Sequence, residues 1–271
     1  PLLYKVAALW GGQEDSLLFW VATLSVLTSV ALAAHGRRNP ELIPYVTGVL
    51  SAISMFFLFL LIFVANPFQT STYGATDGVG LNPLLQNFYM LIHPPALYLG
   101  YVGMSVPFAF ALAALISGRL DNLWVFEIRR WTLIAWFFLT LGNLLGAIWA
   151  YEVLGWGGYW AWDPVENAAL LPWLTATAFL HSIIVQEKLN MLKTWNMILV
   201  ILSFLLTLCG TFLTRSGIIS SVHSFAKSPI GFYFVGFLAL VLVVSVVLLV
   251  YRRSVLKTQG EVDSFLSREA A

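Results

Sequence analysis

One segment of this 271-residue sequence combines aromatic rings, glycines and carboxylates at close spacing. It consists of Trp156-Gly157-Gly158-Tyr159-Trp160-Ala161-Trp162-Asp163-Pro164-Val165-Glu166-Asn167, and long apolar runs flank it. Indoles are common anchors at a membrane interface. Anchoring does not explain why three tryptophans stand so close together, joined by glycines that let the backbone approach a ligand. The segment is therefore expected to present a flat binding face, from about residue 152 to residue 168.

Two of the four histidines are expected on the same membrane face as this aromatic loop. His93 directly precedes Pro94-Pro95, and proline favours the first turn of a helix, so His93 should lie at the outer mouth of a span. His223 should lie in an outer loop between two later spans. A lone interfacial histidine is more often a solvated side chain than a ligand. Two of them beside an aromatic platform could supply both axial nitrogens to a haem iron.

The other two histidines are expected at different depths. His181 falls within an apolar run, about 18 Å from its outer end at about 1.5 Å per residue, and an ionisable group at that depth is functional by default. Either its partner lies outside the given sequence, or His181 hydrogen-bonds to a neighbouring helix. His35 stands beside Arg37-Arg38 and is expected to be solvated at a cytoplasmic helix end.

Asp163 and Glu166 could form a carboxylate pair for acid–base catalysis, but their spacing also matches a helix start. Asp163 as N-cap, Pro164 in the first helical position and Glu166 three residues after the cap form a capping-box pattern. Capping is the preferred interpretation. A helix N-terminus would still attract an anionic group of a bound haem.

Composition predicts the elements that hold these residues. Hydrophobic residues make up 59% of the sequence and charged residues 10%, with a mean hydropathy of +0.84, which is typical of an integral membrane protein. Several runs reach the length of about 20 residues that crosses a bilayer as a helix. They are residues 16–34, 43–65, 95–117, 131–151, 169–186, 195–213 and 230–251. The prediction is an all-α polytopic membrane protein, a single domain over residues 1–271 with about seven transmembrane helices.

Basic residues predict the orientation of these spans, because loops rich in Lys and Arg stay on the cytoplasmic side. One set of loops and the C-terminal tail hold most of the 14 Lys and Arg residues: Arg37, Arg38, Arg119, Arg129, Arg130, Lys188, Lys193, Arg252, Arg253, Lys257 and Arg268. Lys5, Arg215 and Lys227 lie on the other side. The N-terminus and the aromatic loop are therefore expected outside and the C-terminus in the cytoplasm. A net charge of +1 gives no sign of a nucleic-acid partner.

Two glycines predict a close helix contact within the bundle. Gly142 and Gly146 form a G-x-x-x-G pair, a spacing that lets a neighbouring helix approach closely in a membrane. Their expected role is structural.

The C-terminal tail is polar. Residues 260–271 indicate a connection to a further part of a longer protein.

Several of these motifs resemble a known family. The aromatic loop resembles the tryptophan-rich WWD signature of haem-handling membrane proteins, and its continuation Asn167-Ala168-Ala169-Leu170-Leu171-Pro172-Trp173-Leu174 resembles the CcmF branch of cytochrome c biogenesis proteins. Ile92-His93-Pro94-Pro95 is similar to the first external histidine motif of that branch. Leu180-His181-Ser182 resembles its membrane histidine motif, and Thr214-Arg215-Ser216-Gly217 leading to His223 resembles its second external one. The likeness extends over the whole sequence.

The resemblance implies a haem lyase in the bacterial inner membrane, joining haem to the Cys-x-x-Cys-His motif of apocytochrome c on the periplasmic side. No side-chain nucleophile is implied, because the apocytochrome thiols attack the haem vinyl groups. His93 and His223 would be axial ligands of the substrate haem. Its binding platform would be Trp156, Gly157, Gly158, Tyr159, Trp160, Trp162 and Asp163.

The resemblance also implies a second haem and several partners. Family members hold a membrane-embedded haem b between two histidines; His181 matches the first, and the second has no counterpart in this sequence. The implied partners are a haem chaperone of the CcmE type and a CcmH-type protein that presents apocytochrome c, with membrane lipid around the spans.

Two alternatives remain open. A CcsA-type cytochrome c synthase or haem exporter shares the WWD loop but moves haem across the bilayer. A quinol-oxidising cytochrome b subunit would use the aromatic loop as a quinone site. That class normally needs paired histidines within opposing spans, and this sequence shows one, His181.

Overall fold

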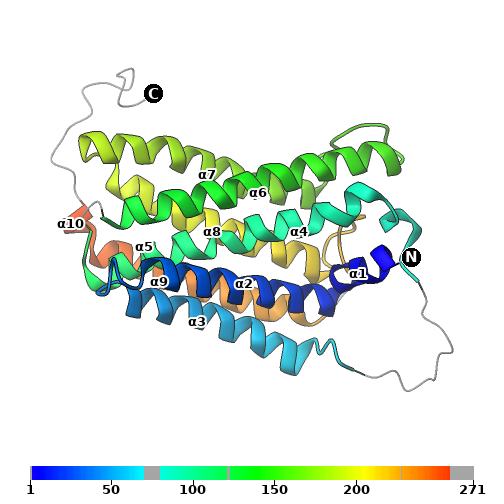
Figure 1. Cartoon of the computed structure of the whole chain (residues 1–271), viewed down its shortest axis with the longest axis horizontal. Coiled ribbons are helices and arrows are strands. Elements are labelled where there is room, and N and C mark those ends of the chain that lie inside the picture. Colours follow the sequence, from blue (N-terminus) through cyan, green and yellow to red (C-terminus); the bar gives the residue numbers. More distant parts are fainter. Residues whose placement is uncertain (1, 70–79, 121–122, 227, 257–271) are drawn as a thin grey trace.

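The computed structural model describes residues 2–69, 80–120, 123–226 and 228–256, which fold as an elongated helical bundle (Figure 1). Its helices are α1 (Leu2–Gly11), α2 (Gln13–His35), α3 (Ile43–Phe59), α4 (Phe88–Gly103), α5 (Ser105–Ser117), α6 (Leu123–Val153), α7 (Pro164–Leu189), α8 (Lys193–Ser216), α9 (Ile230–Tyr251) and α10 (Arg253–Leu256). A π-helical turn (Leu60–Val64) extends α3, and a 3-10 turn (Pro83–Leu85) precedes α4. In this described part of the chain, 7 helical segments are long and apolar enough to cross a membrane. The predicted all-α bundle is therefore confirmed; Lys227, Lys257, Arg268 and the tail at 260–271 lie outside the described residues.

The third span differs most from its predicted bounds, because it begins earlier and is interrupted. It starts at Phe88, where the Asn87 side chain caps the helix by accepting hydrogen bonds from two backbone N–H groups of the first turn. Pro94-Pro95 therefore lies inside α4 rather than in its first turn. The predicted start of this span at residue 95 is therefore too late, and His93, expected at its outer mouth, lies in the second turn of α4. The span breaks at Met104, between α4 and α5.

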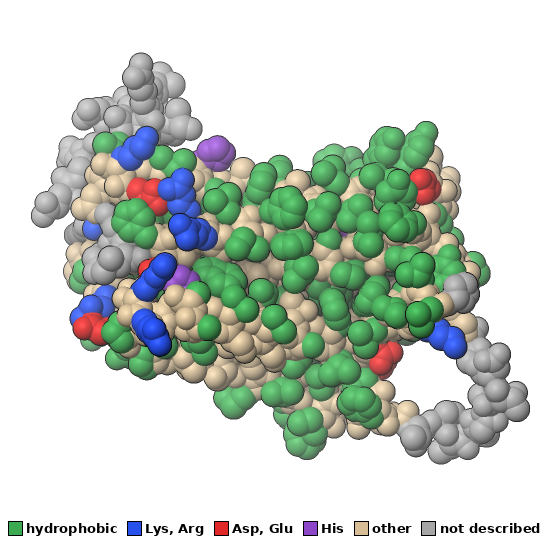
Figure 2. All heavy atoms as spheres, viewed as in Figure 1, with side chains coloured by type: hydrophobic (Ala, Val, Ile, Leu, Met, Phe, Trp, Pro, Cys, Tyr) green, Lys and Arg blue, Asp and Glu red, His purple; other side chains and the backbone are tan. Residues whose placement is uncertain are grey.

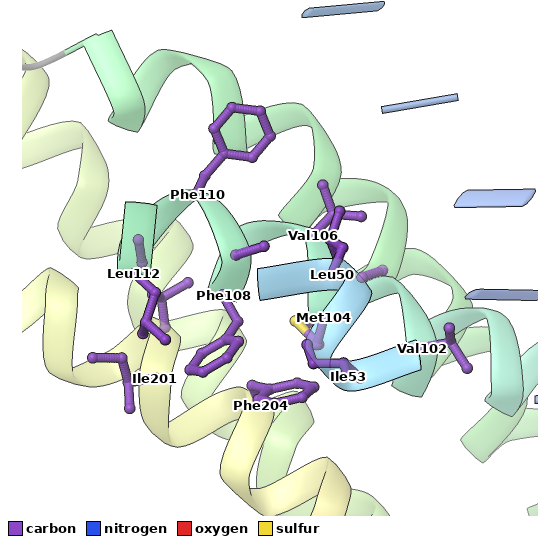
Figure 3. Packing of buried hydrophobic residues seen from close by; sticks show 14 of the residues in the cluster. Leu50, Ile53, Val102, Met104, Val106, Phe108, Phe110, Leu112, Ile201 and Phe204 are labelled. Atoms are coloured by element: carbon purple, nitrogen blue, oxygen red, sulfur yellow. The ribbon is translucent and has the colours of Figure 1, made fainter. Parts of the chain in front are cut away.

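Helix α5 lies among the other helices and is buried from its first residue to Leu115. Phe108 of α5 stacks on Phe204 of α8 with ring centroids 4.2 Å apart. Leu50 and Ile53 of α3 belong to the same cluster of packed side chains (Figure 3). Because close packing rather than transfer from water holds helices together in a bilayer, this central span fixes how α3, α8 and α9 lie around it.

Helices α4 and α6 pack against each other through glycines on both sides. A Cβ added at Gly100 would lie 2.7 Å from the backbone nitrogen of Leu139, and one added at Gly142 would lie 2.9 Å from the Leu97 Cα. Backbone atoms of a helix cannot move away to make room. The close helix contact that the G-x-x-x-G spacing predicts is therefore confirmed.

The two ends of the bundle differ in charge. Figure 2 shows most of the visible Lys and Arg side chains gathered at the end that carries α10 in Figure 1. The aromatic loop after α6 lies at the opposite end, together with α1. Helix α1 was not predicted; it has 10 residues, is too short to span, and packs on α2 and α4. This distribution agrees with the positive-inside rule, and the orientation itself stays a prediction.

The prediction that His35 is solvated is wrong. His35 is 7% exposed, and its Nε2 accepts a hydrogen bond from the Trp131 indole N–H at 2.9 Å. Its Nδ1 contacts the Glu127 carboxylate, which also accepts from the Asn39 side-chain amide at 2.7 Å. The neighbouring arginines indicated solvent, but the first turns of α6 cover this helix end.

Replacing Gly100 with alanine tests the α4–α6 contact. The added methyl group would press on the Leu139 backbone, so the free energy of unfolding should fall by about 1–3 kcal/mol. Gly48 on α3 has nothing within 4 Å of its Cβ position, and Gly48→Ala is the matched control with the same gain in helix propensity. Thermal unfolding in detergent compares the two variants; equal stability would contradict the close contact.

Candidate functional site

A cavity of about 440 Å³ lies at the end of the bundle that carries α1 and the aromatic loop. Its volume is within the range of small-molecule and cofactor pockets, about 300–1,000 Å³. Helices α1, α2, α4, α6, α7 and α8 and the segment after α8 form its walls. Trp10, Trp20, Trp149, His93 and His223 all line it. The fold therefore brings indoles and imidazoles from distant segments to one pocket.

The ring of His93 is fixed by helix α6. Its Nδ1 lies 2.7 Å from the Gly142 carbonyl oxygen, and since a carbonyl only accepts, Nδ1 carries the proton. Nε2 is then the unprotonated nitrogen, which can bind a metal, and it has no hydrogen-bond partner among the described residues. A Cβ at Gly146 would lie 2.6 Å from the His93 Cε1. Gly146, for which only a structural role was expected, therefore also leaves room for this ring.

The ring of His223 is oriented by the start of α7. Its Nδ1 lies 3.2 Å from the Asp163 Oδ2, and the Ser221 hydroxyl donates to the same oxygen at 2.8 Å. A carboxylate behind an imidazole favours the tautomer that carries its proton on the nearer nitrogen, as in many metal sites. His223 and His93 are thus both prepared to offer Nε2.

Trp149 of α6 lies beside both histidines, although the sequence motifs do not single it out. Its ring centroid is 6.5 Å from that of His93, with the planes at 14°, and 5.5 Å from that of His223, with the planes at 76°. The indole is buried, and its Nε1 donates to the Leu84 carbonyl oxygen at 3.0 Å. A tryptophan near the outer end of a span is also a common interface anchor, so its sequence position alone did not distinguish it.

The capping box predicted at the start of α7 is confirmed. The Asp163 side chain accepts from the Val165 N–H at 3.1 Å, and the Glu166 side chain accepts from the Asp163 N–H at 3.3 Å. Glu166 also accepts from the Ala161 N–H at 2.9 Å and so holds the loop before the helix. Because one Asp163 oxygen also contacts His223, the helix cap and the orientation of a site histidine depend on the same carboxylate.

The aromatic loop borders the site with only part of its rings. Trp156, Tyr159 and Trp162 are 38%, 57% and 72% exposed. Tyr159 and Trp160 line a second, smaller cavity of about 50 Å³, which His93 and His223 also line. Within the described structure, the other two tryptophans of the loop line neither cavity.

The aromatic loop has an unusual backbone conformation, and one of its indole N–H groups lacks a hydrogen-bond partner among the described residues. Gly157 and Trp162 both have a left-handed backbone, with φ of 70° and 59°; glycine adopts it freely, whereas in tryptophan it costs on the order of 1 kcal/mol. The Trp156 Nε1 donates to the Gly158 carbonyl oxygen at 3.0 Å. The Trp160 Nε1 is buried and has no partner among the residues that the structure describes. Strained backbone and an unpaired buried donor are features of a surface that binds a ligand or a partner protein.

His181 lies apart from the two cavities, exposed on α7. Because α7 begins at Pro164, His181 is about 25 Å along the helix at about 1.5 Å per residue, deeper than expected. No described residue hydrogen-bonds to its ring. Within the described chain, the interpretation that it bonds to a neighbouring helix is therefore wrong.

Together the fold and the site define a class: a polytopic helical membrane protein with two oriented imidazoles beside an aromatic pocket at one end of its bundle. The family model described as cytochrome C assembly protein matches residues 10–223. The chain belongs to this family, and its similarity to CcmF and CycK proteins over the whole of this chain assigns it to the CcmF branch.

Several relatives resemble the chain from end to end. The cytochrome c-type biogenesis protein CycK of Bradyrhizobium diazoefficiens is 49% identical, over 100% of this chain and 41% of its own length. The cytochrome c-type biogenesis protein CcmF of Escherichia coli is 47% identical, over 100% of this chain and 42% of its own. A solved structure named cytochrome c heme lyase CcmF matches with a TM-score of 0.78 at 39% identity, covering 100% of this chain and 39% of that one. The chain thus spans about two fifths of the length of these relatives.

Replacing Asp163 separates its two roles. Serine caps helices about as well as aspartate, but its shorter side chain lacks the carboxylate that orients His223. Asp163→Ser should therefore change the free energy of unfolding by less than about 1 kcal/mol and speed the modification of His223 by diethyl pyrocarbonate several-fold. Asp163→Ala loses the cap as well and should cost about 0.5–2 kcal/mol. Unchanged His223 reactivity in both variants would show that the carboxylate does not orient the ring.

Proposed function

We propose that this chain carries the external haem site of a haem lyase that attaches haem to apocytochrome c outside the bacterial cytoplasmic membrane. Membership in the cytochrome c assembly family supports the general role and argues against the quinol-oxidising alternative. The lyase activity belongs to the whole protein, because the chain corresponds to about two fifths of its relatives.

The observation that carries this proposal is the pair of histidines at one cavity, each with Nδ1 against an oxygen acceptor. Two imidazoles that offer unprotonated Nε2 atoms suit the axial positions of a haem iron. His93 and His223 are the proposed ligands of the substrate haem. One of them would give way to the histidine of the Cys-x-x-Cys-His motif when haem is transferred.

The walls of the site suit a porphyrin. Trp10, Trp20 and Trp149 provide aromatic surface inside the larger cavity, and Tyr159 and Trp160 continue it toward the aromatic loop. Ring stacking and apolar burial hold a flat macrocycle without fixing its iron. The exposed indoles of the loop, Trp156 and Trp162, would then cover the outer edge of the haem and complete the platform with Gly157, Gly158 and Asp163.

The chemical task of the protein in this reaction is positioning. Each apocytochrome thiol adds across a haem vinyl group: a carbon–sulfur bond forms, the vinyl double bond becomes single, and the thiol proton goes to the other vinyl carbon. The reacting groups belong to the two substrates, so the protein supplies orientation and a high local concentration.

We propose that His181 would hold the iron of a second, membrane-embedded haem b, which would keep the substrate iron reduced. Its ring is exposed on α7 and free of hydrogen bonds to the described residues. This suits a ligand whose partner histidine comes from a part of the protein beyond this chain. The second haem would supply the electron transfer, and His181 would hold its iron.

The proposed partners meet the protein at the end of the bundle that carries the site. A CcmE-type chaperone would deliver haem, and a CcmH-type protein would present apocytochrome c. The exposed rings of Trp156, Tyr159 and Trp162 offer an apolar surface beside the cavities. The concentration of basic residues at the opposite end supports a periplasmic position for the site in the inner membrane (Figure 2).

Removing both proposed ligands should remove the external haem. In the whole protein, with His181→Ala to eliminate the membrane haem, His93→Ala together with His223→Ala should abolish copurification of haem. Each single replacement should lower haem retention by about 10-fold or more. Absorbance spectra of the reduced, detergent-purified proteins measure this, and a full low-spin haem spectrum in the variant without both ligands would overturn the assignment.

Gly146→Ala tests whether the position of the His93 ring matters. The new Cβ would lie 2.6 Å from the ring and should displace it, lowering haem retention at the external site by about 10-fold without removing any ligand atom. Gly48→Ala, at a glycine with open surroundings, should retain haem as the unmodified protein does. Equal retention by both variants would exclude a role for the α4–α6 contact in binding.

A further inference from the structure

Of the Lys and Arg side chains that the structure describes, Arg215 alone is buried, with 1% of its surface exposed. It lies in the last turn of α8 and lines the larger cavity together with His93 and His223. Arg129, by contrast, is half-exposed and pairs with Glu187. Within the part of the chain that the structure describes, Arg215 forms no ion pair with a carboxylate.

Neutral oxygen atoms hold the Arg215 guanidinium in place. Its Nη1 donates to the Gln13 carbonyl oxygen at 3.1 Å and to the Ser16 hydroxyl at 2.7 Å. Its Nη2 donates to the Tyr98 hydroxyl at 2.6 Å, and the Phe225 ring centroid lies 5.3 Å from Cζ. These contacts supply no full negative charge, and the partial charge at the C-terminus of α8 offsets only part of the cation. A buried charge without a counter-ion is costly.

Two guanidinium protons remain available for a ligand. Arginine has five N–H donors, and in Arg215 the Nη1 makes two hydrogen bonds and the Nη2 makes one. The Nε–H has no partner among the described residues. In a guanidinium the Nε–H lies on one edge together with an Nη proton, and such an edge can bind a carboxylate through two parallel hydrogen bonds. Tyr98, which accepts from Arg215, keeps its own hydroxyl proton to donate.

We propose that Arg215, with Tyr98, binds a carboxylate of the ligand in the cavity, namely a propionate of the porphyrin. This inference rests on the proposed haem site and names the group that orients the haem within it. The anion would supply the counter-charge that Arg215 lacks. Axial coordination leaves the macrocycle able to rotate about the line joining the two histidines, whereas a carboxylate fixed at one point of its edge stops that rotation. Arg215 thus determines which edge of the haem presents its vinyl groups to the apocytochrome.

Esterified haem tests this inference without altering the protein. Fe(III) protoporphyrin IX and its dimethyl ester have the same iron, ring and vinyl groups, but the ester has no carboxylate. In titrations of the whole haem-depleted protein in detergent, with His181→Ala to isolate the external site, the ester should bind about 10- to 100-fold more weakly.

Replacing the cation should remove this discrimination. Arg215→Gln should weaken binding of the acid by the same factor and leave binding of the ester nearly unchanged. Tyr98→Phe should weaken the acid selectively by a smaller factor. Arg252→Gln is the matched control, because Arg252 hydrogen-bonds to the Leu115 carbonyl oxygen in the opposite half of the bundle; it should discriminate as the unmodified protein does. Partitioning of the two porphyrins into micelles cancels in the comparison between proteins.

The outcomes separate this inference from the proposal on which it rests. If the ester binds the His181→Ala protein as tightly as the acid, or if adding Arg215→Gln weakens both porphyrins equally, Arg215 has a structural role and the carboxylate site is rejected while the haem site stands. If the His181→Ala protein binds neither porphyrin, the external haem site is rejected, and the carboxylate site with it.

Discussion

The close contact between α4 and α6 is the constraint on which the site depends. Gly142 lets the two helices approach until its carbonyl oxygen lies 2.7 Å from the His93 Nδ1. One turn further along α6, Gly146 leaves the space that the His93 ring fills. In a bilayer, such packing holds helices together, and here the same interface also selects the imidazole tautomer. Stability of the bundle and orientation of the His93 ring therefore have one structural origin.

The second histidine is positioned by a helix end. Asp163 caps α7, and the oxygen that accepts the Val165 N–H also contacts the His223 ring. His223 lies in a loop, 60 residues from Asp163 in the sequence, and its ring is held by contact with the N-terminus of α7. Trp149 of α6 lies beside both rings, so that side chains from three helices and one loop form a single group of contacts.

The polar groups around the cavity are satisfied unevenly, and the exceptions are informative. Buried donors normally find acceptors within the protein, because burying them without one is costly. The Arg215 Nε and the Trp160 Nε1 have none among the described residues, and each belongs to a residue that lines one of the two cavities. Where the fold leaves donors unpaired beside a pocket, a ligand can supply the acceptors. The Arg215 Nε and the Trp160 Nε1 are thus available to a ligand in the two cavities.

The sequence by itself determined the spans, the capping box at Asp163 and the end of the bundle at which His93 and His223 lie. Each of these depends on residues that are near one another in the sequence: an apolar run, a local capping pattern, or the charges of the loops that flank a span. It misplaced the start of α4, since an Asn87 cap outweighed the Pro94-Pro95 signal, and it missed Trp149 and Arg215. Those residues gain their roles from neighbours far away in the chain, such as Ser16 for Arg215. Only the tertiary structure decided which imidazole nitrogen is free, which cation lacks a counter-ion and which indoles face the cavity, because each depends on how helices from distant segments pack.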